Sequence, residues 1–191
     1  MAARPYSSPA RAEASALTRA TILDATIALA YELERTDLTL EQISTRAGRS
    51  VQTLLRHFGS LDALIEAAVQ RGSAQVAQER RPPAGDVGQA LRLLVEHYEL
   101  RGRFVLRLLA REPDDQIVTG PGRLLHRGWV EEVYAEAIGS AGAERDVLTD
   151  LLVVATDVYA WKLLRLDRGL AAGDVERRMI LMTDAVIRRF A

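Results

Sequence analysis

The chain of 191 residues contains no cysteine, which excludes disulfide bonds and metal sites built from thiolates. It also has no apolar run that approaches the roughly 20 residues of a membrane-spanning helix. The first fifteen residues, MAARPYSSPARAEAS, are polar and lack the apolar core of a secretion signal. We therefore expect a cytoplasmic protein that does not contact a membrane.

Catalytic motifs are missing as well. His57, His97 and His126 lie in three separate segments, and no two histidines have the i, i+4 spacing of a helical zinc site. We find no glycine-rich phosphate loop, no nucleophile elbow, no strand-like alternation and no repeat. The sequence predicts an all-α protein that is not an enzyme and has no cofactor or metal.

Charge is balanced over the chain as a whole, with a formal net charge of −1. Any affinity for nucleic acid must therefore be local. The window from Gln42 to Leu61 holds three arginines and one histidine but no acidic residue. Such a window would attract phosphate, although the solvated surface of an ordinary helix has the same appearance.

The same window has the pattern of two short helices joined by a turn. Apolar residues recur at helical spacing before and after Gly48, and Ser50 is placed to cap the second helix. Ser44 is small enough for a steep helix crossing, and a glycine at the turn can take a positive φ. In a DNA-binding helix-turn-helix, the second helix enters the major groove. The predicted DNA contacts are Thr39, Arg49, Ser50, Val51, Gln52, Thr53, Arg56 and His57; a helical hairpin without this function is the alternative.

The segments ATILDATIALA, TLEQISTRAG, SVQTLLRHF and SLDALIEAA follow one another between Arg19 and Ala68. In this order they resemble the DNA-binding domain of TetR (tetracycline-repressor) family regulators. The resemblance implies an all-helical homodimer that represses transcription from a palindromic double-stranded operator. It also implies a variable C-terminal domain that binds a small-molecule inducer.

Three positions depart from the family pattern. Arg49 stands where a small apolar residue is usual, and Leu55 and Leu61 replace a tyrosine and a lysine that commonly hold phosphates. Leucine donates no hydrogen bond. We expect phosphate anchoring to shift to Thr53, His57, Arg49 or Arg56.

The rest of the chain is predicted to be helical, with breaks. Four parts are expected: a disordered tail at 1–15, a helix-turn-helix domain at 16–60, a connecting helix at 61–81, and a ligand-binding and dimerisation domain at 82–191. Within the last part, helices are expected at 86–100, 103–111, 122–138, 145–169 and 174–190. Gly102, the stretch 112–121 and the stretch 139–144 separate them, and two prolines near residue 82 mark the domain boundary.

The family's inducer site is expected between the helices of residues 86–138 and the neighbouring face of 145–169. The candidate ligand-binding residues are His97, Tyr98, Arg101, Phe104, His126, Trp129, Val133 and Asp157. Aromatic residues at helical spacing are also what an ordinary core contains. Asp157 stands out because its neighbours are apolar, and it must face solvent, pair with an arginine or meet a polar group.

The last two predicted helices carry apolar residues on more than one face. We expect a second copy of the chain to bury both faces in a four-helix bundle; the alternative is that these helices form a fully buried core of a single chain. The predicted interface residues are Val154, Val158, Trp161, Ile180, Thr183 and Ile187. Two hypotheses result: a ligand-responsive DNA-binding regulator, or a helical dimeric interaction protein whose degenerate helix-turn-helix has no specific operator.

Overall fold

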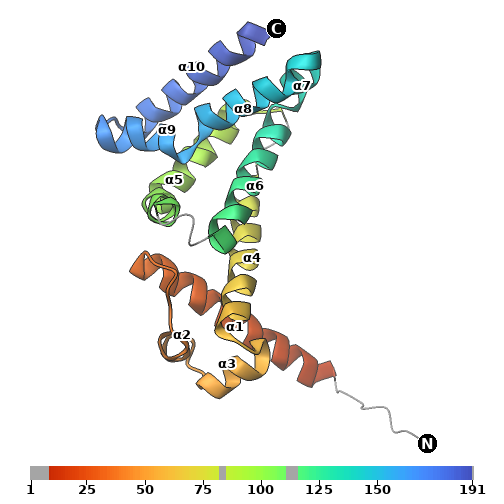
Figure 1. The fold of residues 1–191 in the computed structure, drawn as a ribbon, viewed down its shortest axis with the longest axis vertical. Coiled ribbons are helices and arrows are strands. Elements are labelled where there is room, and N and C mark those ends of the chain that lie inside the picture. The colour runs from red at the N-terminus through yellow and green to blue at the C-terminus, as the bar shows by residue number, and fades with distance from the viewer. Residues whose placement is uncertain (1–8, 82–84, 111–115, 191) are drawn as a thin grey trace, which may run out of the picture. The chain divides into compact units, whose positions relative to one another are not determined.

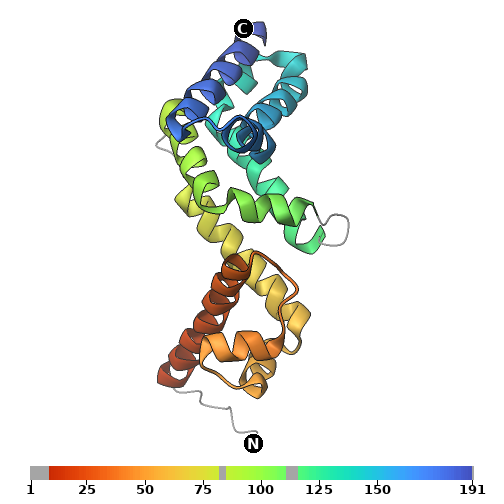
Figure 2. The same ribbon diagram turned by 90° about the vertical axis from the view of Figure 1, so that its left-hand side faces the viewer.

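The computed structural model describes residues 9–81, 85–110 and 116–190. Every regular element in these ranges is a helix, which confirms the all-α fold class (Figures 1 and 2). The chain divides into two compact units, Met1–Gly72 and Ser73–Ala191. Each unit has its own apolar core.

The N-terminal unit contains α1 (Pro9–Leu33), α2 (Leu40–Ala47), α3 (Val51–Phe58) and the first part of α4 (Leu61–Glu79). One apolar side of each helix is buried in a shared core. The buried core residues are Ile22, Leu23, Leu38, Ile43, Ala47, Leu54, Leu64 and Ala68. This small core holds α2 and α3 in place against α1 and α4.

The structure corrects part of the disordered tail predicted at 1–15. Residues 9–15 form the first two turns of α1, whereas residues 1–8 lie outside the described residues. Proline is tolerated in the first turn of a helix, and the following ARAEA run consists of good helix formers. Helix propensity alone therefore extends α1 beyond the residues that pack against the core.

The turn between α2 and α3 has the predicted geometry. Gly48 adopts a left-handed conformation with φ 61°, and the Arg49 N–H donates to the Ser44 carbonyl at 3.1 Å. The Ser44 hydroxyl crosses the turn and donates to the Arg49 carbonyl at 2.6 Å. These bonds satisfy groups at the end of α2 and fix the start of α3.

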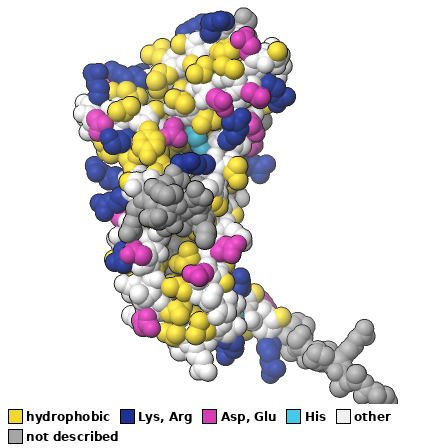
Figure 3. All heavy atoms as spheres, in the orientation of Figure 1, with side chains coloured by type: hydrophobic (Ala, Val, Ile, Leu, Met, Phe, Trp, Pro, Cys, Tyr) yellow, Lys and Arg dark blue, Asp and Glu magenta, His cyan; other side chains and the backbone are white. Residues whose placement is uncertain are grey.

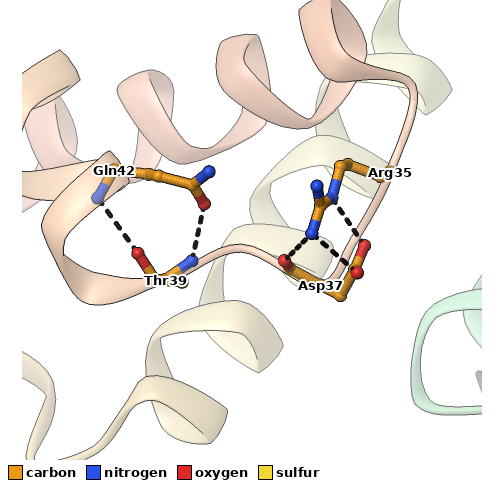
Figure 4. A network of polar contacts seen from close by, with 4 residues as sticks. All are labelled: Arg35, Asp37, Thr39 and Gln42. Atoms are coloured by element: carbon orange, nitrogen blue, oxygen red, sulfur yellow. Dashed lines mark hydrogen bonds and ion pairs between the residues drawn. The ribbon is translucent and has the colours of Figure 1, made fainter.

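The start of α2 is held by a capping box (Figure 4). The Thr39 hydroxyl accepts from the Gln42 N–H at 3.2 Å, and the Gln42 side chain accepts from the Thr39 N–H at 2.9 Å. Just before it, Arg35 forms an ion pair with Asp37 at 2.7 Å. The loop from α1 is thus fixed directly before the turn unit.

The boundary between the units lies inside α4, between Gly72 and Ser73. The sequence placed it at the prolines near residue 82, and α4 does end at Glu79. However, Arg80 just beyond this end is buried within the C-terminal unit. The prolines therefore mark the end of a helix, while packing decides where one unit gives way to the next.

The C-terminal unit is also helical. Its main helices are α5 (Val87–Leu109), α6 (Gln116–Val133), α8 (Arg145–Thr156) and α10 (Ala172–Phe190), and shorter elements are α7 (Ala135–Ser140), the 3-10 turn η1 (Gly142–Glu144), α9 (Val158–Lys162) and the π turn η2 (Leu163–Asp167). Helices α5, α8 and α10 pack on one another, and α6 packs on α5 and α8. Their core includes Leu91, Leu94, Tyr98, Trp129, Val130, Leu148, Leu152, Trp161, Val175 and Met179.

Gly102 does not break the helix, contrary to expectation, because α5 continues through it to Leu109. Its role is steric. A Cβ atom built on Gly102 would lie 2.6 Å from Cζ3 of Trp161, a separation that no side chain tolerates. The glycine lets the indole ring pack directly against the α5 backbone.

Three further boundaries are corrected. The loop predicted at 112–121 is helical from Gln116, with Pro121 inside α6, and the helix predicted at 122–138 divides into α6 and α7 at Tyr134. Residues 111–115 of that loop lie outside the described residues. The helix predicted at 145–169 is interrupted at Asp157, which is extended (φ −69°, ψ 156°) and caps α9 with its carboxylate. A capping aspartate within an apolar run thus ends one helix and begins the next.

Candidate functional site

One face of α3 is exposed and mostly polar. Gln52, Leu55 and Arg56 are exposed at i, i+3 and i+4, and Arg49 and Ser50 precede them at the helix start. On the other side of the helix, Leu54 is completely buried in the core. Helical periodicity therefore presents these side chains to solvent in a fixed register.

Hydroxyl groups cluster at the N-terminal end of α3. Ser50 Oγ accepts from the Thr53 N–H at 3.2 Å and lies 2.9 Å from Thr53 Oγ1. Only one hydroxyl of a hydrogen-bonded pair donates to the other, so one O–H is left to donate elsewhere. A helix N-terminus with free donors is suited to an anion.

The arginines of this region differ in their partners. Arg46 forms an ion pair with Glu32, so its charge is partly offset. Arg49 donates to the Gly48 carbonyl at 3.1 Å, and neither Arg49 nor Arg56 forms an ion pair with another residue of the described ranges. The positive charge on this face comes from these two residues.

Arg19 anchors the far end of α3, a role that the sequence did not reveal. Its Nη1 donates to the His57 carbonyl at 3.0 Å, and its guanidinium lies 4.2 Å from the centre of the Phe58 ring. The His57 side chain is half-buried. No local signal links Arg19 to a helix that begins more than thirty residues later, so only the fold identifies this contact.

The other predicted contact residues lie at the edges of the face. Val51 and Thr53 are half-buried, and Thr39 is exposed while its oxygen caps α2. Of the two unusual leucines, Leu55 is 39% exposed on the face, whereas Leu61 is half-buried against the core. The face combines polar donors with one apolar side chain.

A second cluster of polar groups lies inside the C-terminal unit. We call it the Arg80 cluster, and it consists of Arg80, His97, Tyr98, His126, Trp129 and Thr156. All six side chains are buried. The residue after α4 is thereby joined to α5, α6 and α8.

His126 holds the centre of this cluster and uses both ring nitrogens. Nδ1 lies 3.0 Å from Arg80 Nη2, and Nε2 lies 3.2 Å from Thr156 Oγ1. Arginine only donates, and the Thr156 hydroxyl donates to the Leu152 carbonyl at 2.7 Å. Nδ1 therefore accepts and Nε2 carries the proton, which describes a neutral imidazole. Burial, followed by the charge of Arg80, lowers the pKa of His126 to about 4.

Arg80 is further fixed by Trp129. The indole N–H donates to the Arg80 carbonyl at 3.1 Å, and the guanidinium lies 5.0 Å from the indole centre. The ring of Trp129 also stacks on His126 at 5.9 Å. Tyr98 donates from its hydroxyl to the Thr156 carbonyl at 3.0 Å, and burial raises its pKa.

Two nitrogens of the cluster have no hydrogen-bond partner within the described part of the chain: Nε of Arg80 and Nδ1 of His97. Arg80 is only 4% exposed and forms no ion pair with any described residue. A charge removed from water without a counter-charge costs several kcal/mol. This is the clearest chemical anomaly of the C-terminal unit.

The structure thus brings four of the eight predicted ligand residues together, namely His97, Tyr98, His126 and Trp129. Arg101 instead forms an ion pair with Glu79. Phe104 and Val133 are half-buried. Asp157 accepts from the Tyr159 N–H at 2.8 Å as a helix cap, and burial raises its pKa. Arg80 was missed because its place beside two prolines suggested only a boundary.

The predicted interface residues on α8, α9 and α10 differ in how far they are buried within their own unit. Val158, Trp161 and Thr183 are buried within their own unit, so these three have no surface left to offer a second copy. Trp161 also donates from its indole N–H to Glu99 at 2.9 Å. Ile180 and Ile187 are half-buried against the core, whereas Val154 is 67% exposed.

An exposed apolar surface nevertheless remains on α8, α9 and α10. Yellow side chains gather over this part of the molecule in Figure 3. The exposed large apolar residues are Val147, Leu151, Val154, Tyr159, Leu163 and Leu181. Three of them follow one another along α8 at i, i+4 and i+7, as one stripe of a helix does.

Comparison with protein-family models and with curated proteins finds no match to this chain. Among the helices that the structure describes, none is long and apolar enough to cross a membrane. The described histidines and acidic residues form no group of three that is arranged to hold a metal ion.

Proposed function

We propose that the protein is a DNA-binding transcriptional regulator of the TetR type. The observation that carries this proposal is the exposed polar face of α3, with Gln52 and Arg56 held in register by the buried Leu54. Glutamine can contact adenine in the major groove through both of its polar atoms, and arginine can bind guanine or phosphate. The face follows a capped turn and carries no acidic residue.

Phosphate contacts are assigned to residues at the start of the helix. Arg49 and the hydroxyls of Ser50 and Thr53 are placed where a groove-bound helix meets the DNA backbone. The Thr39 hydroxyl accepts one bond from α2 and keeps its own proton to donate. These donors replace the tyrosine and lysine that Leu55 and Leu61 supplant.

We propose further that the protein acts as a homodimer through the exposed apolar surface of α8 to α10. A second copy would cover Leu151, Val154 and Leu181 by an isologous contact. Two copies present two α3 helices, so the operator is expected to be palindromic. The repressor role is part of this proposal.

A small effector is proposed to bind in the C-terminal unit and to change DNA affinity. The chain supplies a direct connection, since α4 begins three residues after α3 ends and Arg80 follows its last residue. By linkage, an effector that weakens operator binding must itself be bound more weakly by the operator complex, typically by 1–3 kcal/mol.

A titration of duplex DNA at several salt concentrations tests the DNA proposal. Replacing Arg56 with alanine is expected to weaken binding to every sequence and to reduce the salt slope by about one. Gln52→Ala is expected to cost on the order of 1–3 kcal/mol for the preferred site only. Arg103→Ala, an equal charge change at an exposed position of α5, serves as the control.

The second candidate function is a helical dimeric interaction protein without a specific operator. It is favoured by Leu55, which is exposed on the very face that would meet DNA. In that case DNA affinity would be the same for every sequence, and Gln52→Ala would change nothing. The salt titration separates the two candidates.

A further inference from the structure

Arg80 carries a positive charge into the interior of the C-terminal unit. Its guanidinium touches an imidazole and an indole, neither of which is negatively charged. Burial lowers the pKa of Arg80, but a guanidinium stays protonated at any ordinary pH. No carboxylate of the described residues forms an ion pair with it, so the charge is balanced by nothing in this part of the chain.

The unpaired nitrogens of the cluster are few: Arg80 Nε and His97 Nδ1 are both buried without a partner among the described residues. Arg80 Nε is a donor, and His97 Nδ1 is a donor in the tautomer that carries its proton there. His126 cannot supply an acceptor to them, because its two nitrogens are engaged by Arg80 and Thr156. Tyr98 is engaged too, since its hydroxyl donates to a backbone carbonyl. What the cluster lacks is an acceptor that also carries negative charge.

The charge of that acceptor follows from the histidines. Burial and then the charge of Arg80 lower the pKa of His97 to about 3, and His126 is neutral as well. The cluster therefore has a single positive charge near neutral pH. A monoanion balances it, whereas a phosphate dianion would leave a negative charge buried. The planar fork of a guanidinium matches a carboxylate.

We propose that Arg80 and His97 form the polar end of an effector site that binds a small monocarboxylic acid with an apolar body. The apolar body is inferred from the surroundings, because Tyr98, Trp129 and Val130 belong to the buried core. The inference rests on the proposed function in one respect, namely that the C-terminal unit takes a small effector. It adds the chemical class of that effector and the residue that recognises its charge.

Arg80 directly follows α4, so a ligand bound to its side chain is linked to the end of this helix. The Arg80 N–H donates to the Val76 carbonyl at 3.0 Å, so this residue extends the hydrogen bonding of the last turn of α4. A carboxylate bound to the side chain acts directly on the end of the helix that continues into the N-terminal unit. Effector binding and the position of α4 are thereby coupled through one residue.

The test is a binding measurement on the full chain without DNA. Hexanoate, octanoate and benzoate are each compared with the corresponding primary amide by calorimetry and by tryptophan fluorescence, since Trp129 lies against the guanidinium. The acids are expected to bind at least roughly tenfold more tightly than the amides, as for the loss of one charge-assisted hydrogen bond.

Variants locate the site. Arg80→Met is expected to lose the preference for acids and to stay folded, because the backbone carbonyl that accepts from Trp129 remains. Arg81→Met changes the charge equally at the exposed neighbouring position and should bind like the wild type.

Two results would overturn the inference: acids and amides that bind equally, or an acid preference that Arg80→Met retains. The outcome is independent of the DNA proposal. A chain that prefers the acids through Arg80 but shows no sequence-specific DNA binding would refute the regulator and leave the carboxylate site standing. Specific DNA binding without any acid preference would refute the carboxylate site and leave the regulator standing.

Discussion

Among the described residues, those buried in the N-terminal unit are apolar apart from Thr26, whereas those buried in the C-terminal unit include Arg80, two histidines and three threonines. Thr26 donates to the Ile22 carbonyl at 2.8 Å and needs no further partner. The Arg80 cluster, in contrast, leaves two buried nitrogens unpaired within the described ranges. The N-terminal unit thus has its polar side chains on the α3 surface, whereas the C-terminal unit has a polar cluster in its interior.

This difference suggests a division of labour. A surface that binds DNA needs a rigid support, and a closely packed apolar core provides that support without itself contacting the ligand. A buried site for a small molecule instead has to place polar groups where burial is costly, and it accepts a loss of stability for recognition. The following predictions test whether the two units differ in this way.

The largest effect is expected from the core of the N-terminal unit. Leu54→Ala removes a completely buried side chain behind α3 and should destabilise the protein by about 2–5 kcal/mol. Leu55→Ala, at the adjacent and 39% exposed position, should cost only about 0.5–1 kcal/mol. Chemical denaturation measures both values.

Hydrogen exchange on the same variant then tests the separation of the units. Amides of α1 to α3 should lose protection in Leu54→Ala, whereas those of α5 and α8 should keep it. An equal loss in both units would show that they unfold together and do not have separate stabilities.

The next effect concerns the close contact in the C-terminal unit. Gly102→Ala places a methyl group against the Trp161 ring, which Glu99 holds by a hydrogen bond, and should cost about 1–3 kcal/mol. Gly128→Ala in α6 meets no atom within 4 Å, and should stabilise by about 0.5–1 kcal/mol through helix propensity. Thermal unfolding measures the stability change of both variants. A Gly102→Ala variant more stable than the wild type would contradict the close packing of Trp161 on α5.

A pH dependence is expected from the two buried histidines. Their pKa values in the folded protein are about 3 for His97 and about 4 for His126, against about 6.5 in the unfolded chain. Below pH 6.5 the unfolded state binds more protons, so their contribution to stability is complete above that pH and is lost as pH falls toward the folded values. Asp157, whose pKa is raised by burial, acts in the opposite direction at the acidic end.

The size of this effect should be roughly 2 kcal/mol for each histidine between pH 7 and pH 5. Denaturation at a series of pH values measures it, and His97→Gln should flatten the curve. An unchanged curve in that variant would show that His97 does not titrate with unfolding.

The smallest effect is assigned to the cap of α2. Thr39→Ala removes the hydroxyl of the capping box and should cost about 1 kcal/mol. Thr45→Ala, which removes a hydroxyl bonded to the Glu41 carbonyl one turn back, should change stability by only a few tenths of a kcal/mol. Equal effects in thermal unfolding would mean that the cap does not set the start of the helix.

The contrast between the units also explains which features the sequence could predict. The turn at Gly48, the cap at Ser50 and the end of α4 depend on residues within one or two helical turns, and all three are confirmed. The Arg80 cluster joins Arg80 to His126 and Tyr98 to Thr156, which are 46 and 58 residues apart. Contacts of that kind are set by packing and leave no local pattern.

Two mistaken predictions have the same origin. The low helix propensity of glycine predicts a break at Gly102, but the nearby Trp161 ring accounts for a glycine at this position. One continuous helix is predicted over 145–169, yet Asp157 interrupts it and caps α9. In each case a residue that is unfavourable locally is explained by a neighbour that only the fold provides.

The central claim, that α3 reads a DNA sequence, is tested most directly by selecting bound duplexes from a randomised library with the wild-type chain and with Gln52→Ala. We expect the wild type to enrich a palindrome with half-sites about one helical turn apart, and Gln52→Ala to lose the preference at one position of each half-site. Recovery of unenriched random sequences by the wild type would contradict the claim.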